Sequence, residues 1–122
     1  MISSRARRWL RAGLLVALAV QTYLLYTPAP PSPAVPLSGA DLVAHVVLFG
    51  VPAALAWLLR PRWWVPAVLV AYAGGSEVLQ RLVPHRSSDL ADALADAVGV
   101  IAGAGIAWAV RRRASQPTHR LR

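Results

Sequence analysis

The sequence predicts an all-α integral membrane protein, built as a bundle of four transmembrane helices with both termini in the cytoplasm. Hydrophobic residues make up 57% of the 122 residues and charged residues only 15%, against about 25% charged residues in a typical soluble domain. The apolar residues form four long stretches, and the 13 basic and 5 acidic residues are divided unevenly between the two sides of these stretches. The short length predicts a single domain over residues 1–122.

Each apolar stretch has close to the length of a membrane-spanning helix, which needs about 20 apolar residues to cross roughly 30 Å of hydrocarbon. The stretches are too long for barrel strands, and backbone polar groups in lipid must be bonded within their own segment, so helices are expected. The predicted spans cover about residues 10–26, 42–59, 63–83 and 90–110.

The first stretch has a second interpretation. It follows a basic segment and precedes the small-residue sequence Ser32-Pro33-Ala34, which is the order of a signal peptide and its cleavage site. Residues 10–26 are longer than the usual apolar core of about 7 to 15 residues in a signal peptide. We therefore predict a retained helix, with cleavage as the alternative.

The arginines predict the orientation. All 13 basic residues are arginine, and all except Arg81 and Arg86 lie before the first stretch, between the second and third, or after the fourth. The positive-inside rule places these regions in the cytoplasm. All five acidic residues fall on the opposite, outer half: Asp41, Glu77, Asp89, Asp92 and Asp96.

The composition excludes several classes of function. The chain has no cysteine, which rules out disulfides, thiolate nucleophiles and iron–sulfur clusters. No nucleotide-binding or zinc-protease motif is present. Arginines beside a membrane span are typical of a topology signal or of contact with anionic lipid, so no nucleic-acid partner is predicted. No cofactor is predicted, and catalysis is left open.

Ionisable residues at the outer ends of the spans carry the functional information. Such groups cost about 2.5 to 3.5 kcal/mol each at membrane depth, so they are retained where they meet a partner, water or a ligand. Residues spaced i, i+3 or i, i+4 share a helical face. The set contains Asp41 and His45 in the second span, Glu77 and Gln80 in the third, Arg86 in the next turn, and Asp92 and Asp96 in the fourth. We expect them to converge on one outer-leaflet site.

Three interpretations of this site stay open. In the first, Arg86 clamps a phosphate or carboxylate with its planar guanidinium, and Gln80, Asp92 and Asp96 complete the binding site. In this interpretation the candidate catalytic residues are His45, oriented by Asp41 as an acid or base, and Glu77. In the second the site passes protons or cations, and in the third it joins helices without binding anything.

Two further patterns concern metal binding and helix packing. His45, Asp41, Glu77 and Asp92 have suitable chemistry for metal ligands but no diagnostic spacing, so no metal is predicted. Gly99 and Gly103 form a small-x-x-x-small pair that allows close helix approach. Gly74 and Gly75 predict a similar contact or a kink in the third span.

These residues together resemble the VanZ-like family of small bacterial membrane proteins, over about residues 41–103. The resemblance rests on Asp41-x-x-x-His45-x-x-x-Phe49, Glu77-x-x-Gln80, Arg86, and Asp92-x-x-x-Asp96-x-x-Gly99-x-x-x-Gly103. The chain differs from the usual family pattern at Leu42, where a lysine is expected, and at Asp96, where an asparagine is expected. The resemblance implies a role in the cell envelope, because the founding member is associated with resistance to the glycopeptide teicoplanin. The expected partners are a membrane lipid or lipid-linked envelope precursor and a membrane protein.

Overall fold

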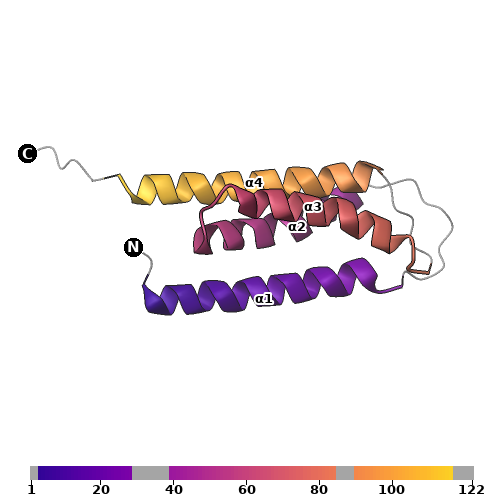
Figure 1. The fold of residues 1–122 in the computed structure, drawn as a ribbon, viewed down its shortest axis with the longest axis horizontal. Coiled ribbons are helices and arrows are strands. Elements are labelled where there is room, and N and C mark those ends of the chain that lie inside the picture. The colour runs from indigo at the N-terminus through magenta and orange to yellow at the C-terminus, as the bar shows by residue number, and fades with distance from the viewer. Residues whose placement is uncertain (1–2, 29–38, 85–89, 117–122) are drawn as a thin grey trace, which may run out of the picture.

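The computed structural model of the chain describes residues 3–28, 39–84 and 90–116. These segments form four helices and no strand, which confirms the all-α prediction (Figure 1). The helices are α1 (Ser4–Tyr26), α2 (Gly39–Leu59), α3 (Trp64–Gln80) and α4 (Leu90–Ala114).

The helix boundaries differ from the predicted spans by one to six residues at five ends, and the structure shows the cause at two of them. α1 begins at Ser4, before the apolar stretch, because the Ser3 side chain caps the helix by accepting a hydrogen bond from the Ala6 amide at 3.2 Å. α3 ends at Gln80 and not at residue 83, because the chain turns there, with the Val83 amide donating to the Gln80 carbonyl at 3.0 Å. Hydrophobicity locates the apolar part of a helix but not its capped ends.

Three of the helices, α1, α2 and α4, are long and apolar enough to cross a membrane. α3 has 17 residues, the lower end of the range of about 17 to 25 for a spanning helix. Large apolar side chains cover the outside of the bundle, with Leu15 68% and Ile101 65% exposed. Such a surface is unusual in water and suited to lipid. The chain is therefore a membrane protein, and a fourth span at α3 stays a prediction.

Consecutive helices run in opposite directions, so the start of α1, the end of α2, the start of α3 and the end of α4 lie at one end of the bundle (Figure 1). We call this the basic end, because its described residues include Arg5, Arg7, Arg8, Arg11, Arg60, Arg62, Arg111, Arg112 and Arg113. The opposite end, which we call the acidic end, holds Asp41, Glu77, Asp92 and Asp96. The membrane orientation stays a prediction, and Arg120 and Arg122 lie outside the described residues.

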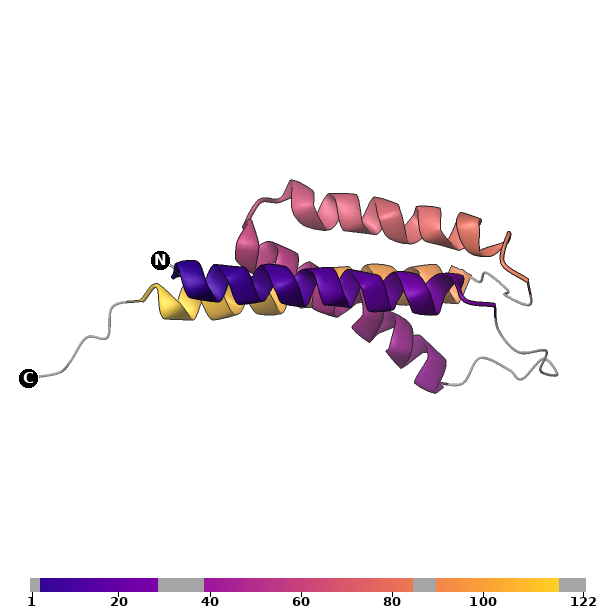
Figure 2. The same cartoon turned by 90° about the horizontal axis from the view of Figure 1, so that it is seen from below.

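α2 crosses the bundle obliquely (Figure 2) and packs closely against α4. A Cβ atom built at Gly99 would overlap the carbonyl oxygen of Val46, and one at Gly103 would overlap that of Gly50. The predicted close approach at Gly99 and Gly103 is confirmed, and Gly50 of α2 is its unpredicted counterpart.

The glycines of α3 behave differently. A Cβ atom at Gly74 or Gly75 would meet nothing within 4 Å among the described residues, and both glycines are exposed. Of the two predicted alternatives, the close contact at this pair is therefore wrong, and the kink stays a prediction. Gly74 and Gly75 do not pack against α1, α2 or α4. The face of α3 that meets the other helices carries Ala73, Ser76 and Glu77 instead.

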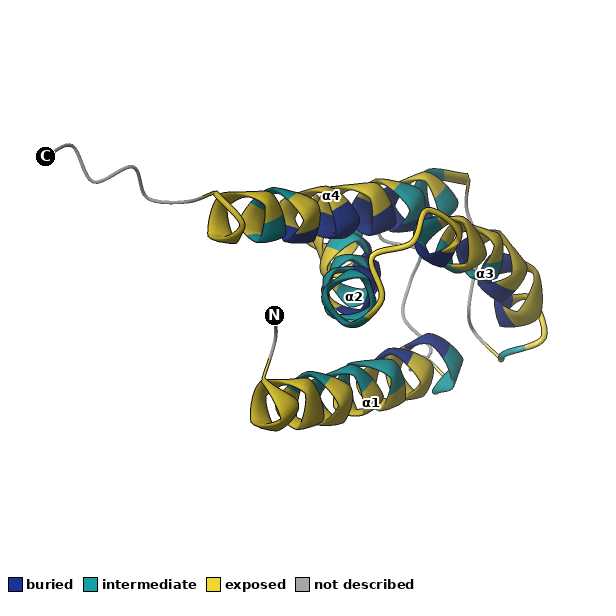
Figure 3. Ribbon diagram, turned by 60° about the vertical axis from the view of Figure 1, so that its left-hand side comes forward, coloured by how far each residue is buried: buried dark blue, intermediate teal, exposed yellow. Residues whose placement is uncertain are grey.

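The apolar core takes side chains from all four helices. Phe49 packs with Ala53, Ala73, Val100 and Leu25, and the side of α4 facing α2 is buried (Figure 3). Phe49 follows His45 by one helical turn, Val100 follows Asp96 by one turn, and Ala73 precedes Glu77 by one turn. Because one turn rises about 5.4 Å, an apolar layer of Phe49, Ala73 and Val100 lies directly beneath the polar residues of the acidic end.

Candidate functional site

Polar side chains are buried in the bundle, most of them near the acidic end. The buried set is Gln21, His45, Ser76, Glu77, Gln80, Asp92 and Asp96. Five of these were predicted site residues, and we use the name polar cluster for them together with Asp41, which is exposed. Their burial follows from their position on the helix faces that pack together, as the i, i+3 and i, i+4 spacings predicted.

Gln21 and Ser76 were missed by the sequence analysis. Ser76 is fully buried, and its hydroxyl donates to the Ala73 carbonyl at 2.7 Å within α3. Gln21 is 1% exposed on α1. The available signal was that Gln21 is the amide side chain in an otherwise apolar stretch of α1, since buried amides in membrane helices usually meet another helix.

His45 of α2 is bonded to Asp96 of α4. The Nδ1 atom of His45 lies 2.8 Å from Oδ1 of Asp96, and both side chains are buried. The i, i+4 spacing predicted that Asp41 orients His45, whereas this hydrogen bond assigns that role to Asp96. The close approach of α2 and α4 at Gly99 explains the pairing, because Gly99 contacts Val46, the neighbour of His45. The other carboxylate oxygen of Asp96, Oδ2, is buried and has no hydrogen-bond partner among the described side chains and backbone.

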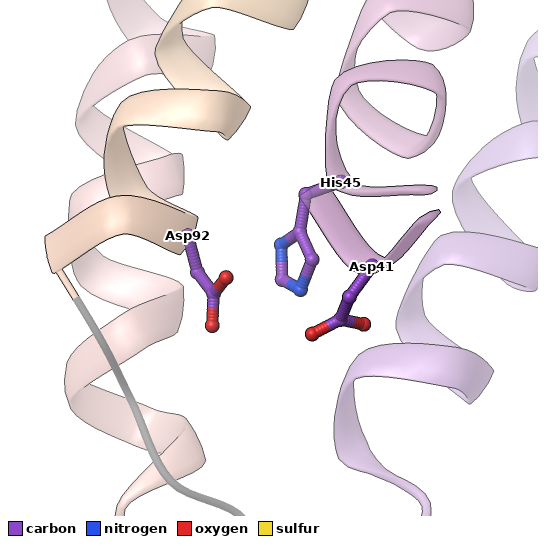
Figure 4. Close-up of side chains that lie close together, drawn as sticks. All are labelled: Asp41, His45 and Asp92. Atoms are coloured by element: carbon purple, nitrogen blue, oxygen red, sulfur yellow. The ribbon is translucent and has the colours of Figure 1, made fainter. Parts of the chain in front are cut away.

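Two more carboxylates approach the other side of the His45 ring. One side-chain ligand atom from each of Asp41, His45 and Asp92 lies within 4.8 Å of the other two. Figure 4 shows a ring nitrogen of His45 between the carboxylates of Asp41 and Asp92. Asp41 is exposed and Asp92 is 5% exposed, so this side of the ring lies at the rim of the bundle.

Glu77 brings α3 into the same cluster. Ligand atoms of His45, Glu77 and Asp96 also lie within 4.8 Å of one another, and all three residues are buried. The sequence predicted that Glu77 and Asp96 converge on one site, and the structure brings their side chains together. Gln80, one turn further along α3, is 1% exposed, and its Nε2 atom has no hydrogen-bond partner within the described segments.

The predicted cations of the site are placed differently. Arg81 is exposed at the end of α3. Arg86, the residue expected to clamp an anion, lies outside the described residues. The geometry of the described part therefore consists of four carboxylates, one imidazole and one amide, which is a set suited to holding protons, cations or a guanidinium.

A groove of about 470 Å³ lies at the basic end, away from the polar cluster, lined by Arg7, Arg11, Arg60 and apolar residues of α1, α2 and α3. At the same end, α4 is bonded to the last turn of α2, because the Arg111 guanidinium donates a hydrogen bond to the Leu58 carbonyl at 2.9 Å. The arginines at this end fit the predicted topology signal.

Comparison with known proteins adds one finding. A model of the family described as VanZ/LLP1 matches residues 16–111, which include all of α2, α3 and the polar cluster and extend the predicted resemblance toward both termini. No curated protein and no solved structure matches the chain at a significant level.

Proposed function

Because the chain belongs to the VanZ/LLP1 family, we propose that it is a multi-pass protein of the bacterial cell membrane that recognises an anionic, lipid-linked component of the cell envelope. The observation that carries this proposal is the convergence of His45, Glu77, Asp92 and Asp96 from three helices at the acidic end. Buried ionisable groups in a membrane bundle mark functional sites by default, because their burial is expensive.

The apolar exterior supports a ligand that arrives through the membrane. A lipid-linked molecule diffuses in the plane of the bilayer, and its headgroup lies at the level of the helix ends. The polar cluster is at such an end, and Asp41 is exposed there. The positive-inside rule makes this the outer end, which is the side on which envelope components are assembled.

In this proposal Arg86 binds the anion and the polar cluster holds and orients the binding groups. In the sequence Arg86 falls between α3 and α4, and a guanidinium binds a phosphate or carboxylate through two parallel hydrogen bonds. His45 is the candidate acid or base for any reaction on the bound component. A link to tolerance of glycopeptide antibiotics is part of the proposal, since it follows from the resemblance.

Two alternatives make different demands on the structure. A permeation module needs polar groups along the whole bundle, but the buried ionisable groups among the described residues all lie on the acidic side of the Phe49, Ala73 and Val100 layer. An assembly subunit without a ligand needs the cluster only for stability, and the His45–Asp96 bond between α2 and α4 favours this as the second candidate.

The test is native mass spectrometry of the purified chain with its co-purifying lipids. We expect the parent to retain an anionic lipid or lipid-linked precursor, and Arg86→Lys to lose most of it while keeping its expression and thermal stability, because the charge survives without the planar group. Arg113→Lys, at the basic end, is the matched control and should retain the lipid. Equal lipid retention by all three proteins would refute the role of Arg86, and a loss of stability in Arg86→Lys would favour the assembly role.

A further inference from the structure

We propose that Asp41, His45 and Asp92 bind a divalent transition-metal ion of the zinc or manganese type, with Asp96 positioning the imidazole. This inference goes beyond the recognition of an envelope component. It concerns the metal alone and can be tested without any lipid ligand.

The ligand atoms of these three residues already lie close together. They come within 4.8 Å of one another, whereas ligands bound about 2.0 to 2.2 Å from a zinc ion are roughly 3 to 3.5 Å apart. Rotation of the Asp41 carboxylate, which is exposed at the start of α2, can close this difference. Asp41 and His45 share one face of α2, and Asp92 of α4 lies within the same 4.8 Å limit.

The independent observation is the state of the His45 ring. The residue is 5% exposed, and its Nδ1 atom is hydrogen-bonded to Asp96. The hydrogen bonds within the described residues include none to Nε2, and a ring nitrogen lies between the Asp41 and Asp92 carboxylates (Figure 4). A buried nitrogen that is aimed at two carboxylates needs either a proton or a cation on it.

Asp96 lies where a carboxylate commonly supports a metal-binding histidine, at the ring nitrogen that does not bind the metal. Metal-ligating histidines commonly donate their other N–H to a carboxylate, which fixes the tautomer and directs the lone pair of the free nitrogen at the metal. In this chain the Nδ1–H of His45 would donate to Asp96, so Nε2 presents its lone pair to Asp41 and Asp92. Asp96 is a positioning residue and not a ligand in this arrangement.

The donor set indicates the kind of ion. An imidazole nitrogen disfavours Mg²⁺ and Ca²⁺, which prefer oxygen ligands alone, while one imidazole with two carboxylates suits Zn²⁺ or Mn²⁺. Three protein ligands leave at least one coordination position open, as in metal sites that bind a substrate or water. The exposure of Asp41 places this open position at the acidic end.

The second group of ligand atoms, His45, Glu77 and Asp96, is the less suitable site. Binding there through Nδ1 would break the 2.8 Å hydrogen bond to Asp96. All three residues are buried, so an ion would have to lose its water entirely to reach them.

The experiment uses the full chain, purified in detergent with its affinity tag removed, stripped with a chelator and titrated with ZnCl₂ against a chromophoric zinc indicator. We expect one zinc ion per chain, and a loss of at least about tenfold in affinity in Asp41→Asn, Asp92→Asn and His45→Gln. Asp96→Leu, which removes the acceptor for the Nδ1–H, should lose about 10- to 100-fold, the usual effect of removing the partner behind a ligating histidine. Ser76→Ala, which changes a buried polar side chain of α3 outside the polar cluster, is the matched control and should bind zinc like the parent. Glu77→Gln distinguishes this site from the inner group, because Glu77 belongs only to the inner group.

Two results would overturn the proposal. One is unchanged zinc binding in Asp41→Asn and Asp92→Asn, and the other is loss of binding in Glu77→Gln with normal binding in Asp41→Asn, which would move the ion to the inner group. Asp41→Asn changes an exposed residue, so it tests the site even where a buried variant does not fold. X-ray absorption at the zinc edge supplies a second measurement, with one imidazole expected among the ligands and its absence counting against the site.

Discussion

His45 and Asp96, 51 residues apart in the chain, lie with Nδ1 and Oδ1 separated by 2.8 Å in the interior between α2 and α4. The bond closes the acidic end of the closest helix pair in the bundle. One and two turns below it, Gly99 and Gly103 let the two backbones touch. The His45–Asp96 bond therefore depends on close helix packing that tolerates no side chain at Gly99 or Gly103. The bond in turn helps to keep α2 and α4 at that distance.

The first prediction concerns this bond. Asp96→Asn keeps an oxygen that can accept a hydrogen bond from Nδ1, so its free energy of unfolding should stay within about 1 kcal/mol of the parent. Asp96→Leu leaves the ring without a partner and should cost about 2 to 4 kcal/mol. Unfolding in mixed detergents measures both. A parent-like Asp96→Leu would show that the bond contributes no stability.

The glycine contact gives the second prediction. Gly103→Ala places a methyl group on the Gly50 carbonyl and should destabilise the protein by about 1 to 3 kcal/mol, the usual cost of overpacking. Gly74→Ala is the control, because a Cβ atom there meets nothing within 4 Å. It should be neutral or stabilising by up to about 1 kcal/mol through helix propensity. The reverse order of the two variants would contradict the described packing of α2 on α4.

The third prediction concerns the hydrogen bond of Arg111. Its guanidinium donates to the Leu58 carbonyl near the end of α2 at 2.9 Å, and a hydrogen bond from a charged donor contributes about 1.5 to 3 kcal/mol. Arg111→Ala should lower the free energy of unfolding by about that amount. Arg113→Ala removes an exposed arginine from the same turn and should change it by less than about 0.5 kcal/mol. Equal effects would mean that net charge, and not the Leu58 bond, is what matters.

The fourth prediction separates two buried carboxylates by function. Glu77→Gln should abolish activity in an antibiotic-susceptibility or envelope-stress assay, because Glu77 is the carboxylate that α3 supplies to the cluster. Asp96→Asn should be tolerated there, since the usual family residue is asparagine. A dead Asp96→Asn together with an active Glu77→Gln would transfer the essential carboxylate to α4.

The fifth prediction concerns the membrane topology. The chain has no native cysteine, so single introduced cysteines can be labelled without background. A cysteine at Ser32 or Ser87 should react with an impermeant reagent in intact cells, and one at Ser115 should not. Labelling at Ser115 would invert the assigned orientation. The intact mass of the purified protein checks α1, since cleavage after Ala34 would remove it.

Much of this arrangement was accessible from the sequence, because hydrophobicity and helical spacing are local properties. They predicted four helices and the convergence of His45, Glu77 and Asp96 on one site. The partner of His45 was not accessible, because it depends on how far α4 slides along α2, which Gly50 determines together with Gly99. The lack of packing at Gly74 was missed for the same reason, since a small residue permits a close contact without saying which helix supplies it.

The apolar layer of Phe49, Ala73 and Val100 also bears on the membrane voltage. A charge that crosses the whole bilayer exchanges about 2.3 kcal/mol per 100 mV. The layer separates the polar cluster from the basic end, so most of the electric field falls between them, and an ion entering beside the exposed Asp41 crosses little of it. Occupancy of the cluster should therefore hardly change when the cell depolarises. An ion bound at the proposed site would therefore follow its own concentration at the acidic end and not the membrane voltage.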